Sequence, residues 1–194
     1  MLITGGAGFI GYHLANKLLE SNYQIDILDN FSRGVNDTQL SNLAKNKNIS
    51  LINADLLPSG TADKFDRDYT YIYHLAAVIG VQHVLKSPYD VLEKNFILLK
   101  NAFKIARKQK KLERFIFAST SEVYAGTLSH YGLSFPTPES TPLTISNLQK
   151  LEQATCFPKF MVRQCASIQN YLLQSSVPII FMVLGWAYPM LFQS

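Results

Sequence analysis

The stretch "MLITGGAGFIGYHLANKLLE", residues 1–20, decides the fold. It opens with a short apolar run that stops at a glycine cluster, and apolar residues then recur at helical spacing from Phe9 onward. Gly5, Gly8 and Gly11 have the spacing G-x-x-G-x-x-G. Glycine there permits a tight turn, close approach of backbone N–H groups to a pyrophosphate and close packing of a helix on a sheet. The stretch therefore predicts a strand, a phosphate-binding turn and a helix.

An alternation of strands and helices continues along the chain. Residues 24–29, 49–56, 69–77 and 114–120 have the composition of strands, and residues 89–110 form the longest helical pattern. Because the strands are continuously apolar, we expect a parallel sheet covered by helices on both faces. The fold class predicted is α/β with a doubly wound parallel sheet.

Asp29 closes the second predicted strand, directly after the glycine motif and its helix. A carboxylate at this position accepts hydrogen bonds from the ribose hydroxyls of an adenosine and repels a 2′-phosphate, so it favours NAD over NADP. Arg33 lies nearby in the sequence and would soften that preference. The alternative interpretation is a glycine-rich turn with a solvated aspartate.

Composition excludes several classes of protein. Of the 194 residues, 47% are hydrophobic and only 16% are charged, which is typical of a globular chain and not of a disordered one. The formal net charge of +4 owes much to the run "RKQKK" at 107–111, which we interpret as the solvated end of a helix and not as a nucleic-acid patch. Cys156 and Cys165 lack the spacing of a metal site or a disulfide framework. We expect no metal and a cytoplasmic location.

No targeting or membrane segment is expected. Glycines begin at Gly5, where the apolar part of a signal peptide would have to run. The apolar run at 177–192 is interrupted by Pro178 and Pro189, which argues against a membrane-spanning helix. Residues 178–184 instead predict a buried strand.

Six motifs together resemble one known family. They are "TGGAGFIG" (4–11), "LDNFSRG" (28–34), "NADL" (53–56), "YHLAA" (73–77), Asn95 and "ASTSEVY" (118–124). In order and spacing they are similar to the extended short-chain dehydrogenase/reductase family, in particular its NAD-dependent nucleotide-sugar epimerases and dehydratases of the UDP-glucose 4-epimerase kind. The resemblance runs from residue 1 to about 149. It implies a Rossmann-type fold, NAD as cofactor, a nucleotide-sugar substrate and a homodimer.

The resemblance also implies roles for individual residues. The residues under the pyrophosphate would be Gly5, Gly8, Phe9, Ile10 and Gly11. Asp29 and Asn30 would hold the adenosine ribose, and Asp55 and Leu56 would flank the adenine. The residues beneath the cofactor would be Leu75, Ala76 and Ala77, and Asn95 and Ser119 would also lie on the cofactor side. A tightly packed strand end is the alternative for residues 75–77. A solvated helix residue is the alternative for Asn95.

The catalytic pattern of the family is incomplete in this chain. By the resemblance, Thr120 would hydrogen-bond the reacting sugar oxygen, and Glu122 matches an acidic residue that dehydratase- and decarboxylase-like members place near the sugar. Hydride transfer also needs a base to remove the hydroxyl proton. The family uses a Tyr-x-x-x-Lys pair, with both side chains on one helix face. None of the ten tyrosines here has a lysine four residues later.

Residues 150–194 differ in character from the first 149. No charged residue follows Arg163, and "FMV" occurs at both 160–162 and 181–183. Read one base earlier, the codons of Met-Val must give glycine, and the surrounding codons permit Tyr-x-x-x-Lys near the first site and R-P-x-N-x-Y-G-P around the second. We therefore interpret residues 1–149 as an NAD-binding domain and 150–194 as an atypical, possible out-of-frame tail, with the substrate domain absent.

This interpretation predicts an inactive epimerase or dehydratase that is a monomer or a weak dimer. The alternatives are a non-catalytic NAD-binding remnant and an unstable product with an apolar tail. Resequencing the DNA across the codons for residues 149–151 tests the frame. We expect one base missing or two added, and an intact frame shared with close relatives would contradict it.

Overall fold

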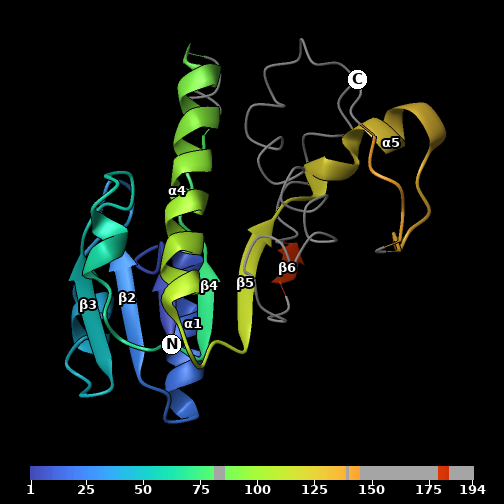
Figure 1. Ribbon diagram of the computed structural model, residues 1–194. Helices are drawn as coiled ribbons and strands as arrows, with labels where there is room; N and C mark the ends of the chain where they lie inside the picture. The colour runs from blue at the N-terminus through green and yellow to red at the C-terminus, as the bar shows by residue number, and fades with distance from the viewer. Residues whose placement is uncertain (81–85, 139, 145–178, 184–194) are drawn as a thin grey trace.

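A six-stranded sheet, in which every neighbouring pair of strands is parallel, forms the centre of the protein (Figure 1). The computed structural model describes residues 1–80, 86–138, 140–144 and 179–183. The strand order is β3-β2-β1-β4-β5-β6. The strands are β1 (Leu2–Thr4), β2 (Ile25–Asp29), β3 (Ile49–Asn53), β4 (Tyr71–His74), β5 (Arg114–Ser119) and β6 (Ile179–Val183).

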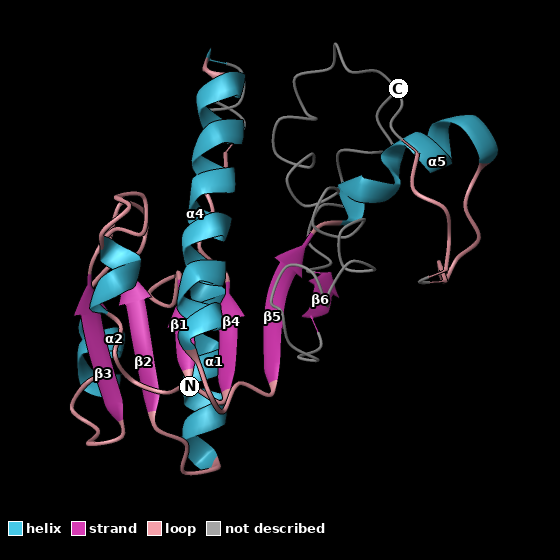
Figure 2. Cartoon of the chain, in the orientation of Figure 1, coloured by secondary structure: helices cyan, strands magenta, loops and turns pink. Residues whose placement is uncertain are grey.

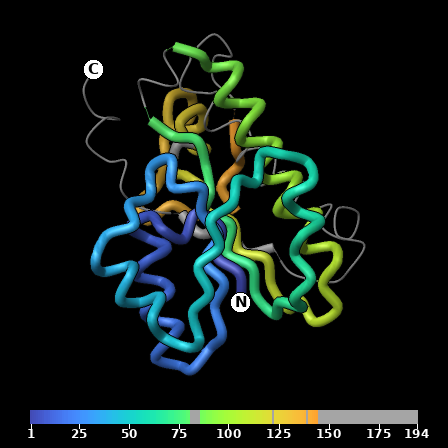
Figure 3. Tube along the Cα trace, turned by 90° about the vertical axis from the view of Figure 1, so that its left-hand side faces the viewer, coloured from blue at the N-terminus to red at the C-terminus, as the bar shows by residue number. Residues whose placement is uncertain are grey.

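Helices cover both faces of this sheet (Figure 2). The helices that pack on it are α1 (Phe9–Glu20), α2 (Thr38–Leu43) and α4 (Pro88–Lys108). Helix α5 (Ala125–Tyr131) lies beyond the carboxyl end of β5, and the short 3₁₀ turns are η1 (Thr61–Lys64) and η2 (Ser121–Tyr124). Seen from the β3 edge, α1 lies on one side of the sheet and α4 on the other (Figure 3).

Two apolar cores result, one on each face. On β1, Leu2 packs in the core under α4 and the next residue, Ile3, packs in the core under α1 and α2; both are fully buried. Full burial of such a side chain contributes about 1.5–3 kcal/mol. Because successive strand residues alternate between the two faces, the strands must be apolar at nearly every position. This confirms the predicted doubly wound parallel sheet.

The predicted strands and helices are confirmed in their order, with differences at strand ends and in two short helices. The third strand was expected to extend to Leu56, but β3 ends at Asn53. β4 ends at His74 and not at Ala77, because its partner β1 ends opposite it at Thr4, where the chain turns away. The loop predicted between β2 and β3 contains α2, which Asp37 caps by accepting a hydrogen bond from the Leu40 N–H at 2.8 Å. Helix α5 was not predicted. The strand expected at 178–184 is present as β6, beside β5.

The connections of β1 place a crevice at the carboxyl edge of the sheet. From β1 the chain passes to β2 and then β3 on one side, and afterwards crosses to β4 on the other side of β1. The helices that follow β1 and β4, α1 and α4, therefore lie on opposite faces of the sheet. In doubly wound sheets, ligands bind at such a switch point.

A buried polar network supports the amino-terminal side of the sheet. Asp26 on β2 is 3% exposed, and its carboxylate accepts a hydrogen bond from Tyr69 Oη at 2.7 Å and pairs with Arg67. Burial, together with the hydrogen bond to Asp26, raises the pKa of the Tyr69 phenol. None of the helices that the structure describes has both the length and the apolar character of a membrane-spanning segment.

Replacing Tyr69 by phenylalanine should lower the free energy of unfolding by about 1–3 kcal/mol, because the buried Asp26 carboxylate loses a donor. The loss should be constant below about pH 10, the ordinary tyrosine pKa, and should shrink above it, because only the wild-type unfolded chain gains by ionising the phenol. Urea unfolding at several pH values measures both quantities.

Tyr71→Phe is the matched control, because the Tyr71 hydroxyl bonds Glu113 at an exposed position. Equal losses for the two variants would contradict a structural role for the Tyr69 bond.

Candidate functional site

The turn between β1 and α1 brings backbone against backbone. Gly5 has a φ of 71°, and a Cβ added to it would lie 2.6 Å from the Ala76 nitrogen. A Cβ on Gly11 would lie 2.4 Å from the Cα of Gly6. No side chain fits at either position, so the fold itself requires these two glycines.

Gly8 differs from the other two glycines of the motif. It precedes α1 with a φ of −76°, and the nearest atom to an added Cβ is the Gly5 carbonyl oxygen at 3.4 Å. The packing of the chain therefore has room for a side chain here. Gly8 offers no capping side chain, and the first turn of α1 contains no acidic residue. The first N–H groups of the helix therefore have no capping side chain and no acidic residue in their own turn, although Asp37 lines the hollow beside them. N–H groups at a helix start suit a phosphate.

Asp29 joins the end of β2 to the glycine turn. Its Oδ2 accepts a hydrogen bond from the Ala7 N–H at 3.0 Å, and its Oδ1 accepts one from the Phe31 N–H at 2.8 Å. Phe31 has a φ of 56°, a left-handed conformation that is unusual for a bulky residue. A Cβ on Gly34 would lie 2.8 Å from Ala7 Cβ, so the loop after β2 also rests on the turn.

Asn30 and Asp55 link the ends of β2 and β3. Asn30 Nδ2 donates to Asp55 Oδ2 at 3.2 Å, and Asp55 Oδ1 accepts the Leu57 N–H at 2.8 Å. Leu56 lies in the core under α4 and is only 3% exposed. Its side chain is therefore part of the core, and only its backbone is near the crevice.

The segment after β4 is held by β1 and α4. The Leu75 N–H donates to the Thr4 carbonyl at 3.0 Å, and Ala76 lies against Gly5. Asn95 makes two bonds to Val78, accepting its N–H at 2.8 Å and donating to its carbonyl at 3.0 Å. Asn95 is thus part of a backbone clamp. Tight packing against Gly5 accounts for the small side chain of Ala76.

The end of β5 carries the predicted catalytic residue Thr120 and the predicted cofactor-side residue Ser119. Ser119 is 2% exposed, and within the described residues its Oγ, like that of Ser121, is buried without a hydrogen-bond partner. Thr120 follows at the strand end and Glu122 lies in η2. The Glu122 side chain lies outside what the structure describes. A buried hydroxyl usually has a hydrogen-bond partner, and for these two no partner lies among the described residues.

A hollow of about 280 Å³ lies beside the start of α1. Its lining includes Gly8, Phe9, His13, Arg33 and Val35. Arg33 Nη1 also reaches the Ile79 carbonyl, after β4, at 3.4 Å. Within the described segments, no three His, Cys, Asp or Glu side chains are placed to hold a metal ion.

The structure brings most predicted site residues to one edge of the sheet. Asp29 is the last residue of β2, and residues 5–11, 30, 55–56 and 75–77 follow the carboxyl ends of β1 to β4. Sequence analysis missed Ala7, Phe31 and Val78, which take part through their backbone. Every residue except proline has a backbone N–H, so the sequence does not show which of these groups make contacts. These contacts follow only from the fold.

A family model for the NAD dependent epimerase/dehydratase family matches residues 1–149 of this chain. The chain belongs to this family. The match ends where the sequence changes character, before residue 150.

Curated relatives of this epimerase/dehydratase-family chain include two nucleotide-sugar enzymes. A UDP-N-acetyl-alpha-D-glucosaminuronate decarboxylase from Bacillus cytotoxicus is 37% identical over 123 residues, which are 63% of this chain and 37% of the relative. A putative UDP-glucose 4-epimerase from Methanocaldococcus jannaschii is 31% identical over 144 residues, 74% of this chain and 44% of the relative. The chain thus spans less than half the length of either relative.

Solved structures of the same kind share the fold. The UDP-Glc/GlcNAc 4-epimerase from Campylobacter jejuni superposes with a TM-score of 0.73 and 25% identity over 94% of this chain and 52% of that one. A UDP-glucuronic acid 4-epimerase from Bacillus cereus, solved in complex with UDP-glucuronic acid and NAD, gives a TM-score of 0.69 and 26% identity over 93% of this chain and 54% of that one.

Alanine substitutions at Gly11 and Gly8 should differ in their effect on the free energy of unfolding. Gly11→Ala should lower the free energy of unfolding by about 1–3 kcal/mol or more, because its Cβ meets backbone that cannot move aside. Gly8→Ala should lower it by about 1 kcal/mol or less, the cost of a poorer helix cap. Urea unfolding followed by circular dichroism measures both values, and equal losses would contradict the distinction.

Proposed function

We propose that this chain binds NAD across the carboxyl edge of its sheet. The observation that carries the proposal is the turn at Gly8, where the chain's own packing leaves room for a side chain in front of uncapped helix N–H groups. A pyrophosphate fits this arrangement because the amide hydrogens and the helix dipole both favour negative charge. Gly5, Phe9, Ile10 and Gly11 would then contribute backbone around it.

Asp29 supports NAD as the dinucleotide. Its carboxylate lies at the end of β2, beside the turn, and each oxygen already accepts one backbone N–H. Each oxygen keeps a lone pair for a ribose hydroxyl, whereas a 2′-phosphate would be repelled. Asn30 and Asp55 extend the same side of the site and would contact the rest of the adenosine. Leu75, Ala76 and Ala77 would lie below the other half.

The substrate class we infer is a nucleotide sugar. The relatives named above support this, being a decarboxylase of a UDP-sugar acid and a putative epimerase of UDP-glucose. Bound NAD supplies a hydride acceptor. On the protein side, Thr120 would hydrogen-bond the sugar hydroxyl, and the unpaired Ser119 hydroxyl would find a partner in the occupied site. Glu122 favours the dehydratase or decarboxylase chemistry over epimerisation.

We further propose that the chain as written binds NAD without turnover. Oxidising a sugar hydroxyl requires a group that accepts its proton as the hydride leaves. The sequence contains no Tyr-x-x-x-Lys pair, and Thr120 has no acidity suited to that role. The change of character after residue 149 supports the same conclusion, since the pair is expected just beyond it.

Calorimetric titration of the full chain with NAD should therefore show binding. Gly8→Ala should weaken it at least tenfold, because the added methyl group occupies the pyrophosphate position. Asp29→Asn should raise the affinity for NADP relative to NAD by roughly tenfold, because a repelling charge is removed. Binding that is indifferent to both substitutions would contradict the proposed site.

Assays of the same preparation with UDP- and dTDP-sugars should show no epimerised, dehydrated or decarboxylated product. Product formation that depends on Thr120 would contradict the second proposal, and would mean that another side chain serves as the base.

A further inference from the structure

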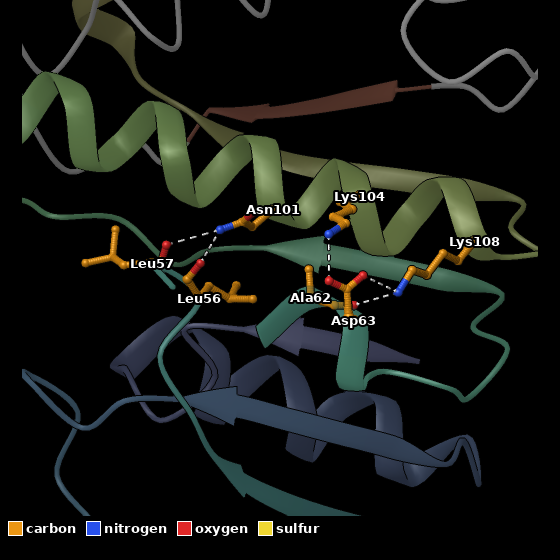
Figure 4. Close-up of polar contacts among 7 residues, drawn as sticks. All are labelled: Leu56, Leu57, Ala62, Asp63, Asn101, Lys104 and Lys108. Atoms are coloured by element: carbon orange, nitrogen blue, oxygen red, sulfur yellow. Dashed lines mark hydrogen bonds and ion pairs between the residues drawn. The ribbon is translucent and has the colours of Figure 1, made fainter. Parts of the chain in front are cut away.

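Helix α4 holds the segment that follows β3 through a buried amide. Asn101 is 5% exposed, and its Nδ2 donates to the Leu56 carbonyl at 2.5 Å and lies 3.4 Å from the Leu57 carbonyl (Figure 4). Both carbonyls are backbone groups of the chain just past the strand. Without the amide, the buried Leu56 carbonyl would lose this donor, which is unfavourable.

The same face of α4 also binds residues 62 and 63, further along the segment that follows β3. Lys104 and Lys108 donate to Asp63 at 2.7 and 3.0 Å, and Lys108 also reaches the Ala62 carbonyl at 3.2 Å (Figure 4). These hydrogen bonds lower the pKa of the Asp63 carboxyl. The pairs are half-exposed, so they are weak anchors compared with the buried amide.

The carbonyls that Asn101 binds belong to the residues next to Asp55. The Leu57 N–H donates to Asp55 Oδ1 at 2.8 Å, and Asp55 Oδ2 accepts from Asn30 at 3.2 Å. A displacement of residues 56 and 57 would therefore move the Asp55 carboxylate and its partner. Asn101 stands at the buried end of this chain of bonds.

Helix α4 holds the two halves of the crevice through two different residues. A doubly wound sheet accepts one mononucleotide over each half, and the carboxylate at the end of β2 marks the adenosine half. Residues 55–57 follow β3 and lie on that half. Val78 follows β4 on the other half, where Asn95 clamps it. Two asparagines of one helix thus each hold a different half.

We propose that Asn101 is a positioning residue for the adenosine half of the site. It touches no ligand. It fixes the backbone of Leu56 and Leu57, and through it the Asp55 carboxylate, at the place where an adenosine is bound. This inference rests on the proposed function.

The test uses AMP as a probe of the adenosine half and NAD as a probe of the whole site, titrated into the full 194-residue chain. Asn101→Ala should weaken binding of both AMP and NAD, each by roughly tenfold. Asn95→Ala, the same substitution on the same helix, should weaken NAD and leave AMP unchanged. Lys104→Ala should alter neither affinity, because it removes only an exposed ion pair.

Amide hydrogen exchange supplies a readout that a general loss of stability does not reproduce. In the ligand-free chain, Asn101→Ala should speed exchange of the Leu57 N–H at least tenfold beyond any change in β1 and β2. Asn101→Leu, which fills the same space without donors, should behave alike.

An AMP affinity that falls equally in the Asn101 and Asn95 variants, or an unchanged Leu57 exchange rate, would overturn the inference. If neither Asn101 variant folds, the residue serves the fold and the inference is also overturned. A wild-type chain that binds neither AMP nor NAD would instead overturn the proposed function, and this inference with it.

Discussion

At the carboxyl end of β1, Gly11 lies on Gly6 and Gly5 lies on Ala76, with no room for a Cβ at either contact. These contacts join three elements: the first turn of α1 rests on the glycine turn, and the turn rests on the chain leaving β4. The position of α1 relative to the sheet follows from them, and so does the direction in which its first N–H groups point. Asp29 joins the end of β2 to the glycine turn by accepting a hydrogen bond from the Ala7 N–H.

The three glycines of the motif serve two purposes. Gly5 and Gly11 are required by contacts within the protein, whereas a Cβ on Gly8 would meet only the Gly5 carbonyl oxygen, at 3.4 Å, among the described residues. Such a vacancy in front of a helix start is what a bound phosphate requires. Elsewhere along the carboxyl edge of the sheet, side chains fix the backbone around the crevice. Asp29, Asp55 and Asn95 each accept a hydrogen bond from a backbone N–H there. Helix α4 connects the two sides through Asn95 and Asn101.

Much of this could be predicted from the sequence, because buried parallel strands and a long amphipathic helix leave strong patterns. The glycine motif and Asp29 likewise have fixed positions relative to their strand. Other features depend on register or on tertiary contacts. The bond between Thr4 and His74, at 2.7 Å, follows from the pairing of β1 with β4. A single asparagine in a helix usually faces solvent, so Asn101 gave no signal. Leu56 was expected at the adenine, but its side chain fills the core.

The central claim is that a dinucleotide binds at the carboxyl edge of β1, β2 and β3. Backbone amide shifts of the isotopically labelled chain, recorded by NMR during titration with NAD, test it most directly. The account predicts changes at residues 7–11, 29–31 and 55–57, with little change at Asp26 and Tyr69 on the opposite edge. Shifts confined to the opposite edge, or no shifts at saturating NAD, would contradict it.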